Sequence, residues 1–137
     1  MDNRGAAIVA AARGLVGART APQGRNTATG IDCLGLAWLA LRSGGIELRV
    51  PQDYSLRADN RARLAEGLQA AGLVPVAKAD MAPGDLVIFA VSAGQHHLAV
   101  WAGETIVHAD FAARRVVETH VPVEWVWIAA RRAGGEE

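Results

Sequence analysis

The order of helical and strand-like patterns along the chain is the feature that most restricts its fold. Apolar residues recur at helical spacing in three segments, at 4–16, from Asp32 or Cys33 to 43, and from Leu64 to Ala71. After the turn signal Pro83-Gly84-Asp85 they form short runs of strand length, at 86–91, 97–102, 105–109, 115–119 and 124–129. Helices followed by consecutive, closely linked strands predict an α+β fold, with N-terminal helices packed on an antiparallel β-sheet.

Residues typical of caps and turns set the expected boundaries of these segments. Asn3 is a candidate cap for the first helix, and Gly44-Gly45 and Gly72 should end the second and the third. We expect loops at 17–30 and 92–96 and an irregular segment at 51–59. The four tryptophans are interpreted as core, although Trp125 or Trp127 could line a cleft because the two share one strand face.

Length and composition predict one folded domain over 1–137, with a frayed tail at 131–137. Fourteen basic and fourteen acidic residues balance, so charge gives no reason to expect nucleic acid or an anionic membrane as a partner. No apolar run reaches the ~20 residues of a membrane span. No signal peptide is recognised either, so we expect synthesis in the cytoplasm and either retention there or export without such a signal. A single cysteine excludes an intrachain disulfide and a zinc site made of several cysteines.

Cys33 is the candidate nucleophile. It follows a glycine-containing loop and starts a helical pattern, where the helix dipole and unpaired N–H groups favour the reactive thiolate. Asp32, immediately before it, is a candidate cap for the same helix. The alternative is that Cys33 is a small buried apolar residue with no chemical role.

His97 and His108 are candidates for the base and for the group that orients it. If Gly103-Glu104 forms a hairpin turn, positions near 99 face positions near 108, and the two histidines come within reach of a diagonal contact. Each histidine, taken alone, could equally satisfy a buried polar contact. No metal-ligand spacing is present, and no metal or cofactor is expected.

The other polar residues have simpler interpretations. Alternation along the strand turns His96 to the face opposite His97, where we expect it to be solvated or to make a rim contact, and His120 should lie in a loop. Asp85 is expected to be structural, while Asp110 either contacts a substrate amine or closes a turn. The pairs Arg114-Arg115 and Arg131-Arg132 are expected on the solvated surface.

Five segments, in order, resemble the NlpC-type cell-wall peptidases, which are papain-like cysteine peptidases. Residues 30–36 (GIDCLGL) resemble the nucleophile segment Asp-Cys-Ser-Gly-Leu, and 44–51 resemble the Gly-Ile-x-Leu-Pro segment that follows. Residues 83–89 (PGDLVIF) match the Pro-Gly-Asp-Leu-Val-Phe-Phe strand. Residues 97–103 (HLAVWAG) resemble the segment that carries the base, and 106–109 (IVHA) the segment that carries the third polar residue.

The resemblance is closest to the branch found in phage tails and gene transfer particles. Leu34 in the nucleophile segment, residues 24–26, and 108–110 with 115–118 are similar to that branch. The resemblance implies a papain-like core, a peptidoglycan stem peptide as substrate, and cleavage between D-glutamate and diaminopimelate. It also implies tail-tip or hub proteins as partners, and a place in the tail of a phage-like particle.

The implied mechanism is acyl transfer by Cys33, with His97 as base, His108 as the orienting group and the Cys33 N–H as oxyanion donor. Asp32 and Asp110 would support the site. One departure from the family is the segment 19–24, which lacks the aromatic residue that many members carry before the nucleophile. Two alternatives remain open. The same residues could serve an amidase or acyltransferase, or the chain could be a structural tail protein that has kept the fold and lost efficient catalysis.

Overall fold

A computed structural model describes residues 3–21, 25–26, 30–48, 61–92 and 94–134. Three α-helices come first in this part of the chain: α1 (Arg4–Gly14), α2 (Cys33–Ser43) and α3 (Arg61–Ala70). A six-stranded sheet follows, built from β3 (Leu73–Val76), β4 (Leu86–Ser92), β5 (Gln95–Trp101), β6 (Ile106–Asp110), β7 (Arg115–Thr119) and β8 (Val126–Ala133). The predicted α+β class, with N-terminal helices and an antiparallel sheet, is confirmed.

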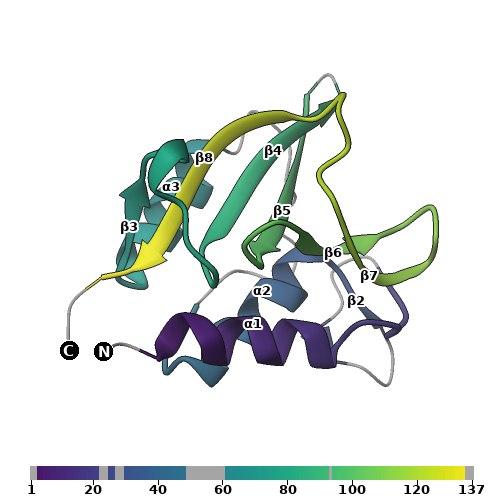
Figure 1. Cartoon of the computed structure of the whole chain (residues 1–137), viewed down its shortest axis with the longest axis horizontal. Helices are drawn as coiled ribbons and strands as arrows, with labels where there is room; N and C mark the ends of the chain where they lie inside the picture. Colours follow the sequence, from purple (N-terminus) through teal and green to yellow (C-terminus); the bar gives the residue numbers. More distant parts are fainter. Residues whose placement is uncertain (1–2, 22–24, 27–29, 49–60, 93, 135–137) are drawn as a thin grey trace.

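The strand order is β3-β8-β4-β5-β6-β7, and each neighbouring pair is antiparallel. Successive hairpins join β4 to β7, as the short links in the sequence predict. The last strand instead returns to lie between β3 and β4 (Figure 1). A smaller two-stranded sheet pairs β1 (Arg25–Asn26) with β2 (Gly30–Ile31). Both strands begin within 17–30, so the expectation of a loop throughout that segment was wrong.

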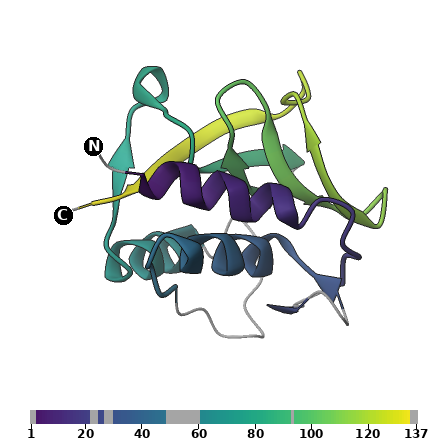
Figure 2. The same ribbon diagram turned by 60° about the horizontal axis from the view of Figure 1, so that its bottom comes forward.

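The two faces of the large sheet bury different sets of side chains. Leu86, Ile88, Leu98 and Val100 pack with α1 and α2 in the main core, and Figure 2 shows the two helices side by side against the sheet. Val87, Phe89 and Ala99 alternate with them and point to the other face, where they form a second cluster with the tryptophans of β5 and β8. The helix-covered face is therefore the principal core.

Most predicted boundaries are close to the observed ones, but several expectations were wrong. The side chain of Asn3 makes no cap hydrogen bond; its carbonyl accepts from Ala7 N at 3.1 Å instead. Strand β3 was missed, and the loop expected at 92–96 contains the end of β4 and the start of β5. Strand β8 runs to Ala133, so residues 131–133 are not a frayed tail. The segment 51–59, and the tail beyond 134, lie outside the described residues.

The arginine pair near the C-terminus is not simply solvated surface. Arg131 Nη1 donates to the Leu73 carbonyl at 2.8 Å, and Arg132 Nε donates to Asp85 Oδ1 at the same distance. Asp85 is 1% exposed and also accepts from Ala82 N. Its expected structural role is confirmed, because it joins the turn before β4 to the last strand. Among the described helices, none has the length and hydropathy needed to cross a bilayer.

Candidate active site

Cys33 is the first residue of α2, and the residue before it caps the helix. Asp32 has an extended backbone, and its Oδ1 accepts a hydrogen bond from Gly35 N at 2.7 Å. This side chain satisfies one of the N–H groups that a helix start leaves without an intrahelical partner. The predicted capping role of Asp32 is confirmed, and it fixes the backbone on which the thiol is carried.

The Cys33 thiol lies against strand β5. It is 8% exposed and belongs to the main core. Burial is the largest influence on its ionisation and raises the pKa to about 12, with the Asp32 carboxylate acting in the same direction. Backbone N–H groups at Leu98, Cys33 and Leu34 oppose the rise. The helix start was expected to favour thiolate, but desolvation of a buried charge is the stronger effect here, and the resting group is a neutral thiol.

His97 and His108 form a hydrogen-bonded pair, with 3.1 Å between His97 Nε2 and His108 Nδ1. Their ring centroids are 5.2 Å apart and the rings are nearly perpendicular. His108 Nε2 lies 3.1 Å from Thr119 Oγ1. A line of polar contacts therefore crosses three neighbouring strands, from β5 through β6 to β7, and holds the His97 ring from one side.

The hairpin register explains why these side chains meet. β5 and β6 pair at Val100↔Val107 and Trp101↔Ile106, so the same register places position 99 opposite His108, as predicted. His97 is then a diagonal neighbour of His108, at a separation that two ring side chains can bridge. Thr119 was not anticipated as part of the site. The same diagonal rule, applied to the pair His108↔Val117 of β6 and β7, identifies it.

Trp125 packs against both histidine rings and against Phe89. The centroid distances are 5.1 Å to His97, 5.2 Å to His108 and 5.5 Å to Phe89, with the two histidine contacts edge-on. The sequence left open whether Trp125 or Trp127 lines a cleft, and the structure places Trp125 beside the histidines. Trp127 instead donates its Nε1–H to the Met81 sulfur at 3.4 Å. The three rings are about equally far from one another, so Trp125 restrains both histidine rings in addition to their hydrogen bonds.

The electrostatics of the pair follow from this enclosure. Burial lowers the His97 pKa to about 4, with a further contribution from His108 and a partial offset by Asp110. Burial also lowers the His108 pKa, again offset by Asp110. The Asp110 Oδ1 atom accepts from Ala112 N and Ala113 N at 2.9 and 3.1 Å, so it closes the turn as one of its two interpretations predicted. Near pH 7 both imidazoles are neutral.

Cys33 contacts Leu98, the residue that follows His97 in β5. The backbone of Leu98 hydrogen-bonds the thiol, while the His97 side chain shares the opposite sheet face with Ala99 and Phe89. β5 and β6 pair regularly only at Val100 and Trp101. The start of α2 therefore contacts β5 at Leu98, outside this paired region. His97 Nε2 is engaged by His108, so Nδ1 is the ring nitrogen that the contact between the two histidines leaves unused.

The structure confirms the expectation for one of the two remaining histidines and not for the other. His96 was expected to be solvated or to lie at a rim and is instead 6% exposed, because the face opposite His97 is the one covered by the helices. His120 is exposed outside the strands, as expected. Among the described residues, no group of three or more histidine, cysteine, aspartate or glutamate side chains is placed to hold a metal ion.

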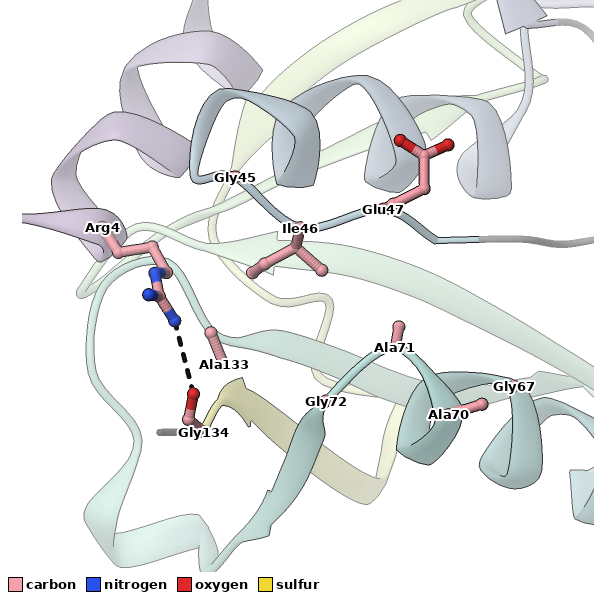
Figure 3. Close-up of a pocket in the computed structure, with 10 residues that line it drawn as sticks. All are labelled: Arg4, Gly45, Ile46, Glu47, Gly67, Ala70, Ala71, Gly72, Ala133 and Gly134. Carbon is pink, nitrogen blue, oxygen red and sulfur yellow. Dashed lines mark hydrogen bonds between the residues drawn. The ribbon is translucent and has the colours of Figure 1, made fainter. Parts of the chain in front are cut away.

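A hollow of about 560 Å³ lies away from these residues, at the other end of α2 (Figure 3). It is bounded by the start of α1, the segment after α2, the end of α3 and the end of β8. The Arg4 side chain lies along one side of the hollow, and its Nη1 donates to the Gly134 carbonyl at 3.4 Å. Glycine and alanine form most of its wall, and none of the candidate catalytic side chains reaches it.

Comparison with known families decides the chain's relationship. The model of the family described as the NlpC/P60 family matches residues 21–130, which include the capped cysteine and both paired histidines. The chain belongs to the NlpC/P60 family. This family generally comprises cysteine peptidoglycan hydrolases. Comparison with curated proteins found no match.

Several solved structures share the NlpC/P60 fold of this chain. NlpC2 from Trichomonas vaginalis is 15% identical with a TM-score of 0.72. The match covers 97% of this chain but only 47% of the NlpC2 chain, so this chain spans about half the length of that protein. The NlpC/p60 domain of the peptidoglycan hydrolase SagA is 22% identical with a TM-score of 0.66, covering 92% of this chain and 96% of its own length. RipD from Mycobacterium tuberculosis is described as a non-catalytic NlpC/p60 domain protein adapted to a peptidoglycan-binding function. It is 16% identical with a TM-score of 0.62, and the match covers 93% of this chain and 95% of the RipD chain.

Proposed function

We propose that this NlpC/P60 protein is a cysteine peptidase that hydrolyses stem peptides of peptidoglycan. The observation that carries the proposal is the 3.1 Å contact between His97 Nε2 and His108 Nδ1, at the strand where Cys33 meets the Leu98 backbone. A nucleophile, a base and an orienting group on adjacent elements are the arrangement required for acyl transfer. The proposed scissile bond, between D-glutamate and diaminopimelate, rests on the motif resemblance.

The chemistry starts from a neutral pair. His97 Nδ1 takes the thiol proton as the Cys33 sulfur attacks the amide carbon, and the negative charge moves to the carbonyl oxygen. We assign the role of oxyanion donor to the backbone N–H of Cys33, because it lies at the start of α2, where N–H groups have no intrahelical partner. The C–N bond then breaks, His97 returns the proton to the leaving amine, and water releases the acyl group from the thioester. His108 keeps the His97 ring oriented throughout, with Thr119 as its own partner.

The test is release of peptides from purified peptidoglycan by the wild-type protein, with products identified by mass. Cys33→Ala and His97→Ala should abolish release while the thermal unfolding midpoint remains within a few degrees. Turnover by Cys33→Ala within tenfold of wild type would contradict the nucleophile assignment. His108→Asn should retain part of the rate and His108→Ala much less, because an asparagine can replace the hydrogen bond to Nε2.

A second candidate function is binding of peptidoglycan without cleavage. The buried thiol with a pKa of about 12 favours it, and RipD provides a structural precedent for such a member. The release experiment separates the two. Co-sedimentation of wild type with peptidoglycan, without released peptide and without change on Cys33→Ala, would support the binding function.

We further propose that the chain works in the tail of a phage-like particle, as a component that opens the wall and contacts tail-tip or hub proteins. The support is the similarity of Leu34, residues 24–26, and 108–110 with 115–118 to that branch. Immunogold labelling of purified particles tests it, since a tail component should label at one end of the particle.

A further inference from the structure

A groove rich in arginine lies between the segment after α1 and the turn that joins β6 to β7. It has a volume of about 960 Å³, in the range of sites for small ligands. Arg19, Arg114 and Arg115 line it together with Phe111, and the lining includes no acidic side chain among the described residues. The chain as a whole is uncharged at pH 7, so this concentration of positive charge is local.

Backbone hydrogen bonds hold the two walls of the groove together. Gly17 N donates to the Val116 carbonyl at 2.8 Å, and Val116 N donates to the Ala18 carbonyl at 2.9 Å. Arg19 and Arg115 are direct partners in an antiparallel bridge. Residues directly opposite each other point to the same face, and like charges in that arrangement destabilise the pairing. The two arginine side chains therefore start from the same face of the bridge despite an electrostatic cost.

Arg114 adds a third charge in an unusual conformation. Its φ of 63° is in the left-handed region, which a side chain larger than that of glycine or asparagine adopts at a cost of about 1 kcal/mol. Its carbonyl accepts from Thr20 N at 3.3 Å, so the turn is fixed against the opposite wall. The turn thus keeps an arginine at a position where glycine would be less strained.

The three guanidinium groups form no ion pair within the described part of the chain. Asp110 is opposite Arg115 in the register of β6 and β7, but its carboxylate accepts from the N–H groups of Ala112 and Ala113 in the turn. An incoming anion would therefore meet three positive charges without displacing a carboxylate of the protein. Guanidinium groups bind carboxylates through two parallel hydrogen bonds.

The groove adjoins the candidate active site along two elements. Thr20 bridges Ile31, two residues before Cys33. On the other wall, Arg115 pairs with Asp110, which is two residues from His108 and so about 7 Å further along the strand. Because Asp110 and His108 have the same parity in β6, Arg115 lies on the same sheet face as the histidine pair.

We propose that this groove is a subsite for a carboxylate of the peptide substrate, held by Arg19 and Arg115, with Arg114 and Phe111 against the adjoining part of the peptide. The inference rests on the proposed function, since it assigns the groove to the same substrate. Stem peptides containing D-glutamate and diaminopimelate carry carboxylates beside the bond that would be cut, and such a group requires a cationic partner near the nucleophile. Phosphate-bearing polymers share the negative charge, and the test separates them.

Binding to the Cys33→Ala protein tests the subsite without requiring turnover. The probe is a synthetic D-glutamyl-diaminopimelate peptide, titrated by calorimetry beside the same peptide with its carboxylates converted to amides. We expect Arg19→Gln and Arg115→Gln each to weaken binding of the free acid about tenfold, as for loss of a charged hydrogen bond. The amidated peptide should bind weakly and be insensitive to both variants. Arg115→Lys should recover part of the affinity, because the charge is kept.

Arg42→Gln is the matched control, because it removes one positive charge at the far end of α2, where Arg42 lies over Trp38. The proposal would be overturned if Arg42→Gln weakened binding of the free-acid peptide as much as Arg19→Gln and Arg115→Gln do. It would also be overturned if these two variants weakened binding of the amidated peptide equally, or if the free-acid peptide did not bind measurably. Binding of inorganic phosphate that Arg115→Gln removes, with no binding of the peptide, would assign the groove to a phosphate ligand instead. Peptide binding with no turnover in the wild type would refute the peptidase function and leave the subsite standing.

Discussion

Modification of Cys33 by a small disulfide reagent tests how the candidate site is ionised at rest. With a pKa of about 12, only about 1 in 10⁵ molecules carries a thiolate at pH 7, compared with about 3% of an ordinary thiol. The thiolate that forms is more nucleophilic, which recovers roughly 40-fold over this pKa difference. The net result is a rate about a hundredfold below that of free cysteine, and the 8% exposure of Cys33 lowers it further.

The assay follows release of the coloured thiolate from the reagent between pH 6 and 9. We expect the rate to rise about tenfold per pH unit without levelling off, since the pKa lies far above this range. His97→Ala should leave the rate within about threefold. A plateau with an inflection below pH 7, lost in His97→Ala, would show a thiolate–imidazolium pair and would refute the neutral resting state. Such a plateau would mean that the helix start and His97 together stabilise the thiolate more than burial destabilises it.

Three further predictions concern stability and the histidine pair. Because the His97 pKa is lowered to about 4, the unfolded state binds more protons between pH 6.5 and 4. The free energy of unfolding should therefore fall by about 3 kcal/mol as the pH drops through that range, and His97→Gln should reduce this slope in urea titrations. Asp85→Ala should lower the free energy of unfolding by roughly 2–4 kcal/mol, because Arg132 and the Ala82 N–H lose a buried partner. The exposed Asp80→Ala should cost less than about 0.5 kcal/mol, and equal losses would contradict the assigned role of Asp85. Trp125→Ala should lower kcat on peptidoglycan at least about tenfold while Trp125→Phe retains most of it, since an aromatic ring keeps the edge contacts to both histidines; unchanged kcat in both would remove Trp125 from the site.

The predictions from sequence that the structure confirms depend on local interactions. Helix α2 begins after the capping Asp32 and ends before Gly44-Gly45 as predicted, because caps and chain breakers act within a few residues. Strand β7 has the predicted bounds. The meeting of His97 with His108 followed from one hairpin register. In each case the residues that interact are separated by a turn at most.

Strand β3 and the end of β8 depended on contacts between distant segments. β3 contains Pro75, which argues against an internal strand, but β3 lies at the edge of the sheet where a missing N–H is tolerated. The last residues of β8 include two arginines that suggested surface. They are strand because their backbone pairs with Pro75 and Val74 of β3, and the two side chains then bond to the Leu73 carbonyl and to Asp85, 58 and 47 residues away.

The sequence by itself therefore determined the α+β class, the capped cysteine and the paired histidines, since turn residues and periodicity specify each of them locally. Only the tertiary structure decided the ionisation of Cys33, because packing of α2 against β5 removes the thiol from water and outweighs the helix start. It also decided the position of Trp125, and it brought together the arginines of two segments nearly a hundred residues apart. These features depend on which surfaces meet, and local sequence patterns do not encode that.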